Sequence, residues 1–470
     1  MAISARCRKI QRSDGAGIAL ERGGDRRTRP LADQLELSIP GRVYIALIVL
    51  AAILLAFAFI GIEYSLRGIP IARVTAIGDA GGPPCIGEPL FEHTMELFTG
   101  ATLHEGNDVR VLVNGDETYP ALWEDLRRAR QSITLQTYFC KPGKMADVLA
   151  EIITERARAG VRVLFLFDAF GAHDLSDDYL DRLRDAGVRV ASFRPVHWYS
   201  LHKAQHRSHI RVVVVDGSIG YTGGFGIDDN WYGDGRSDDQ WRDTNVRFTG
   251  PAVAQLQATF AAGWVEATGE LVTGDVFFPE LQPSDDSACL AALFHSAPTI
   301  GSTPAARFVA LTIAGARERL YITNSYFVPD EDLVEILIHA ARRGVDVRVL
   351  TAGPKTDVKI TRWAGRGRYH ELLKGGVRIY EYQPTMMHAK TFVADGLWTS
   401  VGTMNFDNRS MVFNDESNLL VLDRTVGSTM NTLFHADLRS SLEVKREEFE
   451  KRGFLAKGAE RMALTLSRLL

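Results

Sequence analysis

The chain contains 470 residues, of which 46% are hydrophobic and 24% are charged, and its formal net charge is −4. This length and apolar content are sufficient to bury the cores of more than one domain. The slight acidic surplus argues against a general nucleic-acid binder, which usually carries a basic surplus, so no nucleic-acid partner is expected. The four cysteines are scattered without CxxC or Cys/His spacing, which argues against a zinc site and a disulfide framework.

An uncharged apolar segment follows a polar stretch near the start of the chain. Residues 1–42 contain arginine, glycine and aspartate without apolar periodicity, and we expect a flexible cytoplasmic tail. Residues 43–62 then read VYIALIVLAAILLAFAFIGI. As a helix this segment would span about 30 Å, the thickness of the hydrocarbon core of a bilayer. A buried helix would show a polar stripe, and a cleaved signal peptide would have a shorter apolar stretch, so a retained transmembrane anchor is predicted.

The arginines on the two sides of this segment predict its orientation. The four nearest arginines before it are Arg26, Arg27, Arg29 and Arg42, and those that follow it closely are Arg67 and Arg73. Because positive charge is enriched on the cytoplasmic side, we expect a single-pass protein of the inner or cell membrane with a periplasmic main body. Residues 63–107 would form a membrane-proximal linker.

Two later stretches of the chain repeat one another. The first contains SITLQTYF, ARAGVRVLFLFD and LRDAGVRVASFRP, and the second contains LYITNSYF, ARRGVDVRVLTA and LLKGGVRIYEYQP. Three pairs of matched residues lie 188, 184 and 189 positions apart: Tyr138 and Tyr326, Gly160 and Gly344, Gly187 and Gly376. Such nearly constant spacing indicates a duplication.

Each repeat predicts the order strand, helix, strand, helix, strand, because helical patterns that end in glycine alternate with apolar, β-rich runs. Strands that alternate with helices predict α/β layers with a largely buried sheet. Leu271–Pro304 is rich in proline, serine, aspartate and glycine and is predicted to be an inter-domain linker. The two domains would then be residues 108–270 and 305–470.

A polar motif recurs in the element that follows each repeat. The second half has His-x-Lys-x4-Asp and the first half has His-x-Arg-x4-Asp, formed by His388, Lys390 and Asp395, and by His209, Arg211 and Asp216. In a strand, positions i and i+2 point to one face, so each histidine is presented together with its basic partner. Two copies at equivalent positions of a repeat argue against a chance pattern.

This combination of side chains suits transfer of a phosphodiester. A neutral imidazole can attack phosphorus while Lys or Arg neutralises the non-bridging oxygens. A second imidazole can protonate the departing alkoxide and later deprotonate the incoming alcohol. Because cationic side chains supply the positive charge, the motif requires no metal and no other cofactor.

The segment HAKTFVADGLWTSVGTMNFDNRSMVFNDE, His388–Glu416, resembles the second catalytic motif of the phospholipase D superfamily. Within it, GTMNFDNRS followed by NDE resembles the cardiolipin synthase branch, as do Asn114–Ile133, Trp241–Val253 and Asn324–Leu333. The similarity covers about residues 108–422. It implies two similar domains, each a mixed sheet flanked by helices, related by a pseudo-twofold axis after one N-terminal transmembrane helix. The two histidines would meet at the interface of these domains.

The resemblance also implies roles for individual residues. His209 would be the nucleophile that forms a phosphohistidine, and His388 would be the general acid. Lys390 and Arg211 would hold the phosphate, and Asn405 would add a hydrogen-bond donor.

Further residues of the motifs are implied by the same resemblance. Asp243 would orient His209 and Glu416 would orient His388, while Asp216 and Asp395 complete the motifs and are expected to serve structure more than chemistry. Arg211 departs from the lysine that is usual in the family; it keeps the charge but is bulkier. Gly226 departs from the usual asparagine and removes one donor from the first half.

The favoured function is transfer of a phosphatidyl group from one phosphatidylglycerol to another, and the anchor would hold the site near its lipid partners in the bilayer. A hydrolytic phospholipase D shares the first half-reaction and remains the alternative.

A nuclease would need a basic, aromatic-lined groove. The one local basic cluster is more typical of a solvated face or a headgroup-binding patch: Lys359, Arg362, Arg366 and Arg368. A non-catalytic scaffold is disfavoured by the intact second motif. The oligomeric state is left open.

Overall fold

The computed structural model describes residues 41–67, 71, 73–75, 82–195, 205–281, 289–298 and 303–466. The chain forms two compact units, Met1–Phe59 and Ile60–Leu470. Helix α1, Gly41–Arg67, contains the described part of the first unit. The apolar side chains that are described within α1, at residues 43–58, are exposed. Within the part of the chain that the structure describes, no helix has both the length and the hydropathy that crossing a bilayer requires. The anchor at residues 43–62 therefore stays a prediction, and the predicted tail lies outside the described residues except for Gly41 and Arg42.

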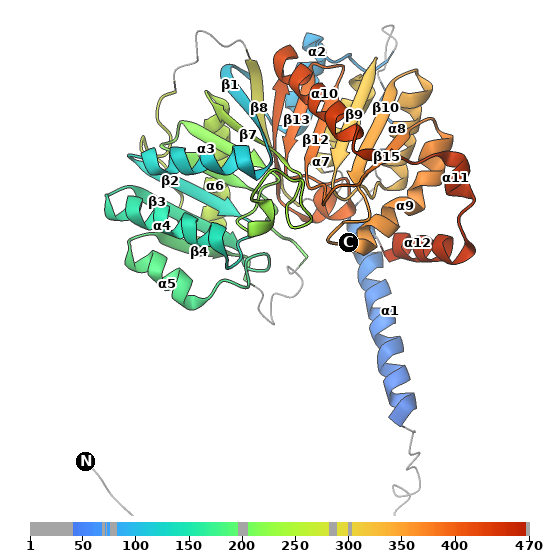
Figure 1. The fold of residues 1–470 in the computed structure, drawn as a ribbon, viewed down its shortest axis with the longest axis horizontal. Helices are drawn as coiled ribbons and strands as arrows, with labels where there is room; N and C mark the ends of the chain where they lie inside the picture. Colours follow the sequence, from blue (N-terminus) through green and yellow to red (C-terminus); the bar gives the residue numbers. More distant parts are fainter. Residues whose placement is uncertain are drawn as a thin grey trace, which may run out of the picture. The chain divides into compact units, whose positions relative to one another are not determined.

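The second unit is built on a single sheet of 15 strands, in the order β15-β11-β10-β9-β12-β13-β14-β8-β1-β7-β6-β5-β2-β3-β4 (Figure 1). The strands are β1 His104–Val113, β2 Ser132–Thr137, β3 Arg162–Asp168, β4 Arg189–Phe193, β5 Val212–Val215, β6 Ile219–Gly223, β7 Thr244–Thr249, β8 Cys289–Ser296, β9 Arg319–Asn324, β10 Asp346–Ala352, β11 Arg378–Tyr382, β12 Lys390–Ala394, β13 Trp398–Gly402, β14 Glu416–Leu422 and β15 Ser441–Glu443. The sheet is mixed, since β2-β3-β4 and β9-β10-β11 are parallel while the strands between them and the centre are antiparallel.

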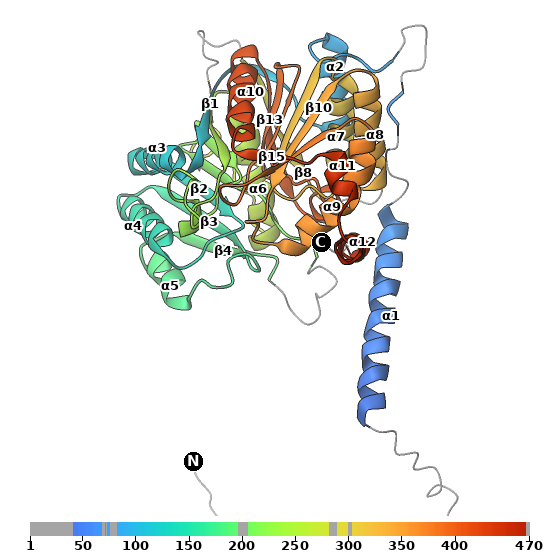
Figure 2. The same cartoon turned by 45° about the vertical axis from the view of Figure 1, so that its right-hand side comes forward.

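The strand order on one side of the β8–β1 pair repeats the order on the other side. Reading outward from the pair, β7-β6-β5-β2-β3-β4 corresponds to β14-β13-β12-β9-β10-β11. The helices are α2 Pro89–Thr99, α3 Asn114–Arg128, α4 Lys144–Arg158, α5 Asp177–Asp185, α6 Ala252–Thr268, α7 Pro304–Gly315, α8 Glu331–Arg342, α9 Lys359–Lys374, α10 Arg424–Leu438, α11 Arg446–Glu450 and α12 Phe454–Leu466. They flank the sheet (Figures 1 and 2). The predicted order of strands and helices within each repeat is confirmed.

Matched glycines end the helices that cross between parallel strands. Gly160 follows α4 with φ of 93° and Gly344 follows α8 with φ of 96°. Gly187 and Gly376 follow α5 and α9 with φ of 94° and 97°. These left-handed conformations are easily adopted only by glycine, so the duplication extends to the backbone conformation at each helix end.

One part of the predicted domain division needs correction. Strand β8, CLAALFHS, lies inside the segment 271–304 that the composition predicts to be a linker. It pairs with β14 along its whole length and with β1 at its start, so it joins the two halves of the sheet. The short apolar run is flanked by polar, proline-containing sequence, and that flanking composition conceals the strand. The remaining domain boundaries stay predictions.

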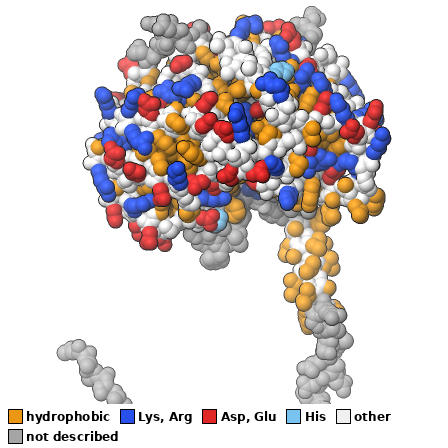
Figure 3. All heavy atoms as spheres, in the orientation of Figure 1, with side chains coloured by type: hydrophobic (Ala, Val, Ile, Leu, Met, Phe, Trp, Pro, Cys, Tyr) orange, Lys and Arg blue, Asp and Glu red, His pale blue; other side chains and the backbone are white. Residues whose placement is uncertain are grey.

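Hydrophobic side chains fill both faces of the sheet. One cluster packs α3, α4 and α5 on the first half, a second packs α2, α7 and α8 on the second half, and a third joins both halves through Phe260 on α6 and Phe434 on α10. On the face drawn in Figure 3, Lys and Arg side chains are interspersed with Asp and Glu. That face shows no single-sign charged groove of the kind a nucleic acid would require.

The aspartates of the two motifs lie at the far ends of their strands from the histidines. Asp216 and Asp395 have φ of 50° and 53° and are each followed by a glycine with positive φ, as in the tight turn of a hairpin. The carboxylate of Asp216 accepts hydrogen bonds from the backbone N–H groups of residues 130, 131 and 132. Asp395 accepts the equivalent bonds from residues 317, 318 and 319. Each carboxylate thus ties a hairpin to the start of the neighbouring strand.

We predict that Asp395→Ala lowers the stability of the fold while the chemistry survives. Loss of an ionised acceptor that binds three N–H groups should cost about 1.5–3 kcal/mol and lower the melting temperature. Asp395→Asn, which keeps one acceptor and tolerates positive φ, should lose less. Thermal unfolding measures both effects. A normal melting temperature together with a large loss of kcat in Asp395→Ala would contradict this structural role.

Candidate active site

The histidines and basic residues of both motifs lie buried where β5 and β12 begin. His209 and His388 precede these strands, and their side chains are almost completely buried. Arg211 and Lys390 are equally inaccessible, with exposed fractions of 0% and 1%. Asp216 and Asp395, by contrast, are not part of this cluster. Because β5 and β12 are equivalent strands of the repeated order, the sheet presents the two motifs in the same way.

Each imidazole is bonded to a carboxylate from the other half of the chain. His209 Nδ1 lies 2.9 Å from Glu416 Oε2 and 3.0 Å from Oε1. His388 Nδ1 lies 2.9 Å from Asp243 Oδ2. The expected pairing, Asp243 with His209 and Glu416 with His388, is therefore wrong, because the two carboxylates are exchanged.

Two short parallel bridges between the halves explain this exchange. Ser208 pairs with Asp415, and His209 N–H donates to the Asp415 carbonyl at 3.0 Å. In the matching position Arg242 pairs with Met387, and His388 N–H donates to the Arg242 carbonyl at 2.7 Å. Each histidine segment thus runs beside the segment that carries the carboxylate of the opposite half.

Largely buried ion pairs flank these bridges. Asp415 accepts from Arg194 Nη1 at 2.6 Å, and Arg242 Nη2 donates to Asp437 at 2.8 Å. Both pairs join the two halves, and both involve the residue directly before a histidine-binding carboxylate. Removing one partner of such a pair leaves an uncompensated buried charge, which makes the crossed arrangement difficult to undo.

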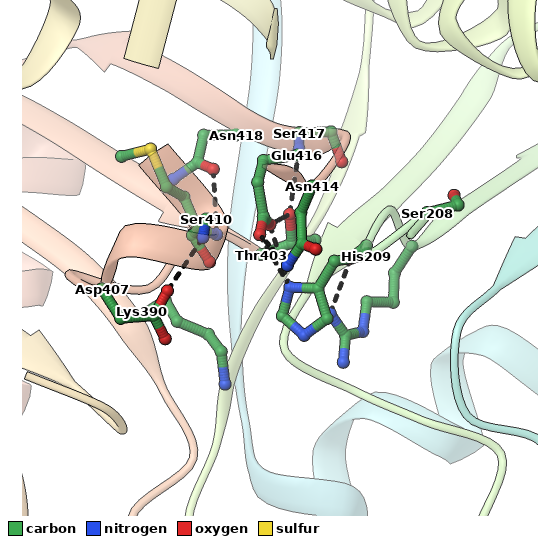
Figure 4. Close-up of polar contacts among 12 residues, drawn as sticks. Ser208, His209, Lys390, Thr403, Asp407, Ser410, Asn414, Glu416, Ser417 and Asn418 are labelled. Carbon is green, nitrogen blue, oxygen red and sulfur yellow. Dashed lines mark hydrogen bonds and ion pairs between the residues drawn. The ribbon is translucent and has the colours of Figure 1, made fainter. Parts of the chain in front are cut away.

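The Glu416 carboxylate is surrounded by second-half donors (Figure 4). Thr403 Oγ1 donates to it at 2.5 Å and Asn414 Nδ2 at 3.3 Å, in addition to His209. Burial raises the pKa of Glu416 to about 7, although these hydrogen bonds and Arg211 oppose the shift. The His209–Glu416 pair is therefore positioned to retain a proton near neutral pH.

The Asp243 carboxylate has different surroundings and a different protonation preference. It accepts from the Trp231 indole at 2.9 Å and from the Thr244 backbone N–H at 2.8 Å. Burial alone would raise the pKa of Asp243, but the contact with His388 and the nearby Lys390 ammonium hold it below its ordinary value. The two carboxylates are therefore not electrostatically equivalent.

Lys390 lies against the imidazole of its own motif. Its Nζ donates to the His388 carbonyl at 2.6 Å and to Ser325 Oγ at 2.9 Å, and it lies 2.9 Å from His388 Nε2. Burial lowers the pKa of Lys390 to about 7. The ammonium is thus shielded from water, and its hydrogen-bond partners among the described residues are neutral groups, so an anionic ligand would be a stronger partner.

The described residues satisfy only part of the Arg211 guanidinium. Its Nη1 donates to the His209 carbonyl at 2.7 Å and its Nε to the Phe225 carbonyl at 3.3 Å. Among the described residues, its buried Nη2 has no hydrogen-bond partner. A buried guanidinium nitrogen without an acceptor indicates a place for an anionic group.

The surroundings of both imidazoles favour the neutral form. Burial, followed by Lys390, lowers the pKa of His388 to about 4 although Asp243 opposes the shift. Burial, followed by Arg211 and Lys390, lowers the pKa of His209 well below its ordinary value. The cations of both motifs act on both imidazoles, so the two halves contribute to one electrostatic environment. It combines two neutral bases with two buried cations.

The first half replaces the equivalent of Asn405 with glycine. Asn405 is buried, and among the described residues its Oδ1 has no hydrogen-bond partner. A Cβ at Gly226 would lie 3.0 Å from Trp231 Cζ3 and 3.1 Å from Phe139 Cβ. The indole of Trp231 occupies this space and meets the His388 ring edge-on, with centroids 5.0 Å apart. Trp231 was not identified from the sequence, because its contact with the second motif arises only from folding.

Three residues before His209, His206 has its Nδ1 3.3 Å from the Phe413 carbonyl. The arginines of the basic cluster on α9 form ion pairs with acidic residues: Arg362 and Arg366 with Glu381, and Arg368 with Glu331.

We predict that each carboxylate variant perturbs the histidine of the opposite half. Asp243→Asn removes the charge that raises the pKa of His388, so this pKa should fall further, and the His388 Nδ1–H resonance should move. Glu416→Gln should instead move the His209 resonance. Nitrogen-15 spectra of the imidazole rings, assigned with His209→Ala and His388→Ala, measure this. A His388 signal that responds to Glu416→Gln and not to Asp243→Asn would contradict the crossed pairing.

Comparisons with known proteins identify the family of this chain. The family described as cardiolipin synthase, PLD-like domain, matches residues 122–264 and 309–438, one segment in each half. A cardiolipin synthase of Geobacillus sp. strain WCH70 is 35% identical over 81% of this chain and 77% of its own length. Cardiolipin synthase A of Pseudomonas syringae is 34% identical over 84% of both chains.

A solved structure shares the fold at low sequence identity. Phosphatidylserine synthase of Haemophilus influenzae has a TM-score of 0.62 at 12% identity, over 81% of this chain and 99% of its own. The family match covers more than half of the chain, and the curated relatives exceed 30% identity over most of both lengths. The chain therefore belongs to the cardiolipin synthase family of phospholipase D-like enzymes, the phosphatidyltransferases that its motifs resemble.

Proposed function

We propose that this phosphatidyltransferase is a membrane-bound cardiolipin synthase that acts on phosphatidylglycerol through a phosphohistidine. The observation that carries the proposal is the pair of crossed imidazole–carboxylate contacts beside Arg211 and Lys390. Two neutral imidazoles supply a nucleophile and a proton carrier, and two buried cations supply the charge that a phosphodiester needs. The repeated strand order supports two similar domains related by a pseudo-twofold axis.

In the first half-reaction His209 attacks the phosphorus of one phosphatidylglycerol. A bond from the imidazole nitrogen to phosphorus forms, the bond from phosphorus to the headgroup glycerol oxygen breaks, and His388 protonates that oxygen. The Lys390 ammonium and Arg211 Nη2, which has no hydrogen-bond partner among the described residues, bind the non-bridging oxygens, with Asn405 as a further donor. The bound anion raises the pKa of the neighbouring His388, which then takes up the proton that the leaving alkoxide requires.

In the second half-reaction a second phosphatidylglycerol replaces the released glycerol. His388 removes a proton from its headgroup hydroxyl, and the resulting oxygen attacks phosphorus as the bond to His209 breaks. Glu416 orients His209 and stabilises its positive charge, and Asp243 does the same for His388. Water in place of the second lipid would give phosphatidic acid instead.

We further propose that residues 43–62 anchor the enzyme in the inner or cell membrane with its body in the periplasm. The arginine distribution and the exposed apolar side chains described within α1 support this placement. An anchor keeps the catalytic unit beside substrates that remain in the bilayer.

We predict that the purified enzyme converts labelled phosphatidylglycerol into cardiolipin and glycerol in equal amounts. His209→Ala should lose turnover and any covalent adduct, whereas His339→Ala, which alters an exposed histidine on α8, should be as active as the unmodified enzyme. Thin-layer chromatography of the lipid products measures the outcome. Phosphatidic acid as the principal product would show a hydrolase and exclude the proposed transfer.

We also predict an alkaline decline of activity that Lys390 controls. The pKa of Lys390 is lowered to about 7, so the free enzyme loses the cation as pH rises through 7 and kcat/KM should fall. Lys390→Arg keeps its charge at every accessible pH and matches the arginine of the first motif. Its maximal rate should be lower, but its alkaline limb should move upward by a unit or more. If the activity of this variant still declines near pH 7, Lys390 does not control the decline, and Glu416, whose pKa is also about 7, would be the titrating group.

A further inference from the structure

Helix α12 is fixed to the body of the protein by one of its faces. Ala463 is buried against Ala364 of α9 and Val328. Glu460, also buried, binds Arg366 of α9 at 3.0 Å and forms a second ion pair with Arg452. The orientation of α12 about its own axis is therefore determined.

The opposite face of α12 exposes large apolar side chains. Phe454 and Leu455 are each 85% exposed, and Met462 is 66% exposed. With 100° per residue, these three positions lie on the side of the helix away from residues 460 and 463. Exposed apolar groups of this size on a short helix usually mark an interaction surface.

The charges on α12 favour an anionic partner. Arg461 and Lys457 are exposed, whereas Glu460, the one acidic residue of α12, is buried in its ion pairs. An amphipathic helix with an apolar outer face and flanking basic residues is suited to the interface of an anionic bilayer.

Helix α9 connects this face to the active site. It begins beside Asp357, which accepts from the Tyr326 hydroxyl at 2.7 Å, and the Tyr326 ring lies 5.9 Å from Lys390 Nζ. On α9 itself, Trp363 is exposed. It directly precedes Ala364, which packs against Ala463 of α12. Trp363 thus adds an exposed apolar side chain beside α12, and orange side chains gather at the lower right of Figure 3, where α12 lies.

A comparable set of exposed apolar residues occurs on α2, with a different charge. Leu90, Leu97 and Phe98 are exposed there, but α2 carries Glu92 and Glu96, which an anionic surface would repel. Helix α2 lies at the opposite end of this unit from α12 (Figures 1 and 2). It therefore provides a matched control.

We propose that the outer face of α12, together with Trp363 of α9, is a docking surface that inserts into the headgroup region of an anionic bilayer. Docking would bring α9, and the active-site residues near its start, toward the lipid surface. This inference rests on the proposed function, because it supplies the route by which lipid substrates reach the buried cations. It adds a second membrane contact, made by the catalytic unit itself.

Depth-dependent quenching tests the contact without reference to activity. The full chain is reconstituted in phosphatidylglycerol vesicles after Cys7→Ser and Cys85→Ser, and carries a fluorophore at Met462→Cys or, as control, at Leu97→Cys. Phospholipids brominated on their acyl chains should quench the label at 462 at least threefold more than the label at 97. Equal quenching at both positions, or stronger quenching at 97, would overturn the proposal.

A substrate comparison tests the consequence for catalysis. Phe454→Ser, Leu455→Ser and Met462→Ser together should lower turnover of vesicle phosphatidylglycerol at least tenfold but leave a short-chain, monomeric analogue unaffected. The matched variant with Leu90→Ser, Leu97→Ser and Phe98→Ser should lose neither activity. Equal loss on both substrates would show a structural role for α12 and contradict docking. If the unmodified enzyme turns over neither lipid, the proposed function fails, while the quenching experiment still decides the docking.

Discussion

The exchange of carboxylates between the two halves is the constraint on which the rest of the site depends. His209 and Glu416 lie in different repeats, as do His388 and Asp243, so neither half alone can orient its own imidazole. The bridges between Ser208 and Asp415 and between Arg242 and Met387 place these partners within hydrogen-bond distance. The central β8–β1 pair keeps the two half-sheets in register behind them.

Burial then sets the electrostatic character of this shared site. Inaccessibility to water lowers the pKa of His388 to about 4 and of Lys390 to about 7, and it raises the pKa of Glu416 to about 7. Burying charged groups costs desolvation free energy. The attraction between the carboxylates and the cations of the two halves offsets part of this free energy. A site of this kind favours neutral imidazoles when empty and a bound anion between its cations. These are the conditions that phosphoryl transfer through a histidine requires.

The sequence predicted the repeated architecture because the duplication is recorded in local patterns. Glycine positions such as Gly160 and Gly344 and the two motifs survive in both halves at matching distances, and the structure confirms the order of elements that they indicate. The carboxylate pairing could not be obtained this way. The family resemblance implied that Asp243 serves His209, whereas the bridges that exchange the partners are tertiary contacts. Strand β8 was not predicted, because polar and proline-containing sequence on both sides of it made the whole segment 271–304 resemble a linker.

Trp231 illustrates a second limit of sequence reasoning. Gly226 was identified as the loss of a donor in the first half, but the structure shows an indole in the vacated space, bonded to Asp243 and packed against His388. Gly226 and Trp231 are five residues apart, and their relation becomes visible only in the folded loop, where the indole fills the space beside the glycine and contacts the second motif. The electrostatic difference between the two halves therefore follows from local packing as much as from the motifs.

The most direct test of the crossed site is leaving-group rescue of the carboxylate variants. A nitrophenyl phosphodiester departs without protonation, so it should restore activity to a variant that has lost only the proton donor. Asp243→Asn should then be rescued together with His388→Ala, while Glu416→Gln and His209→Ala stay impaired on both substrates. Rescue of His388→Ala together with Glu416→Gln, and not with Asp243→Asn, would contradict the account.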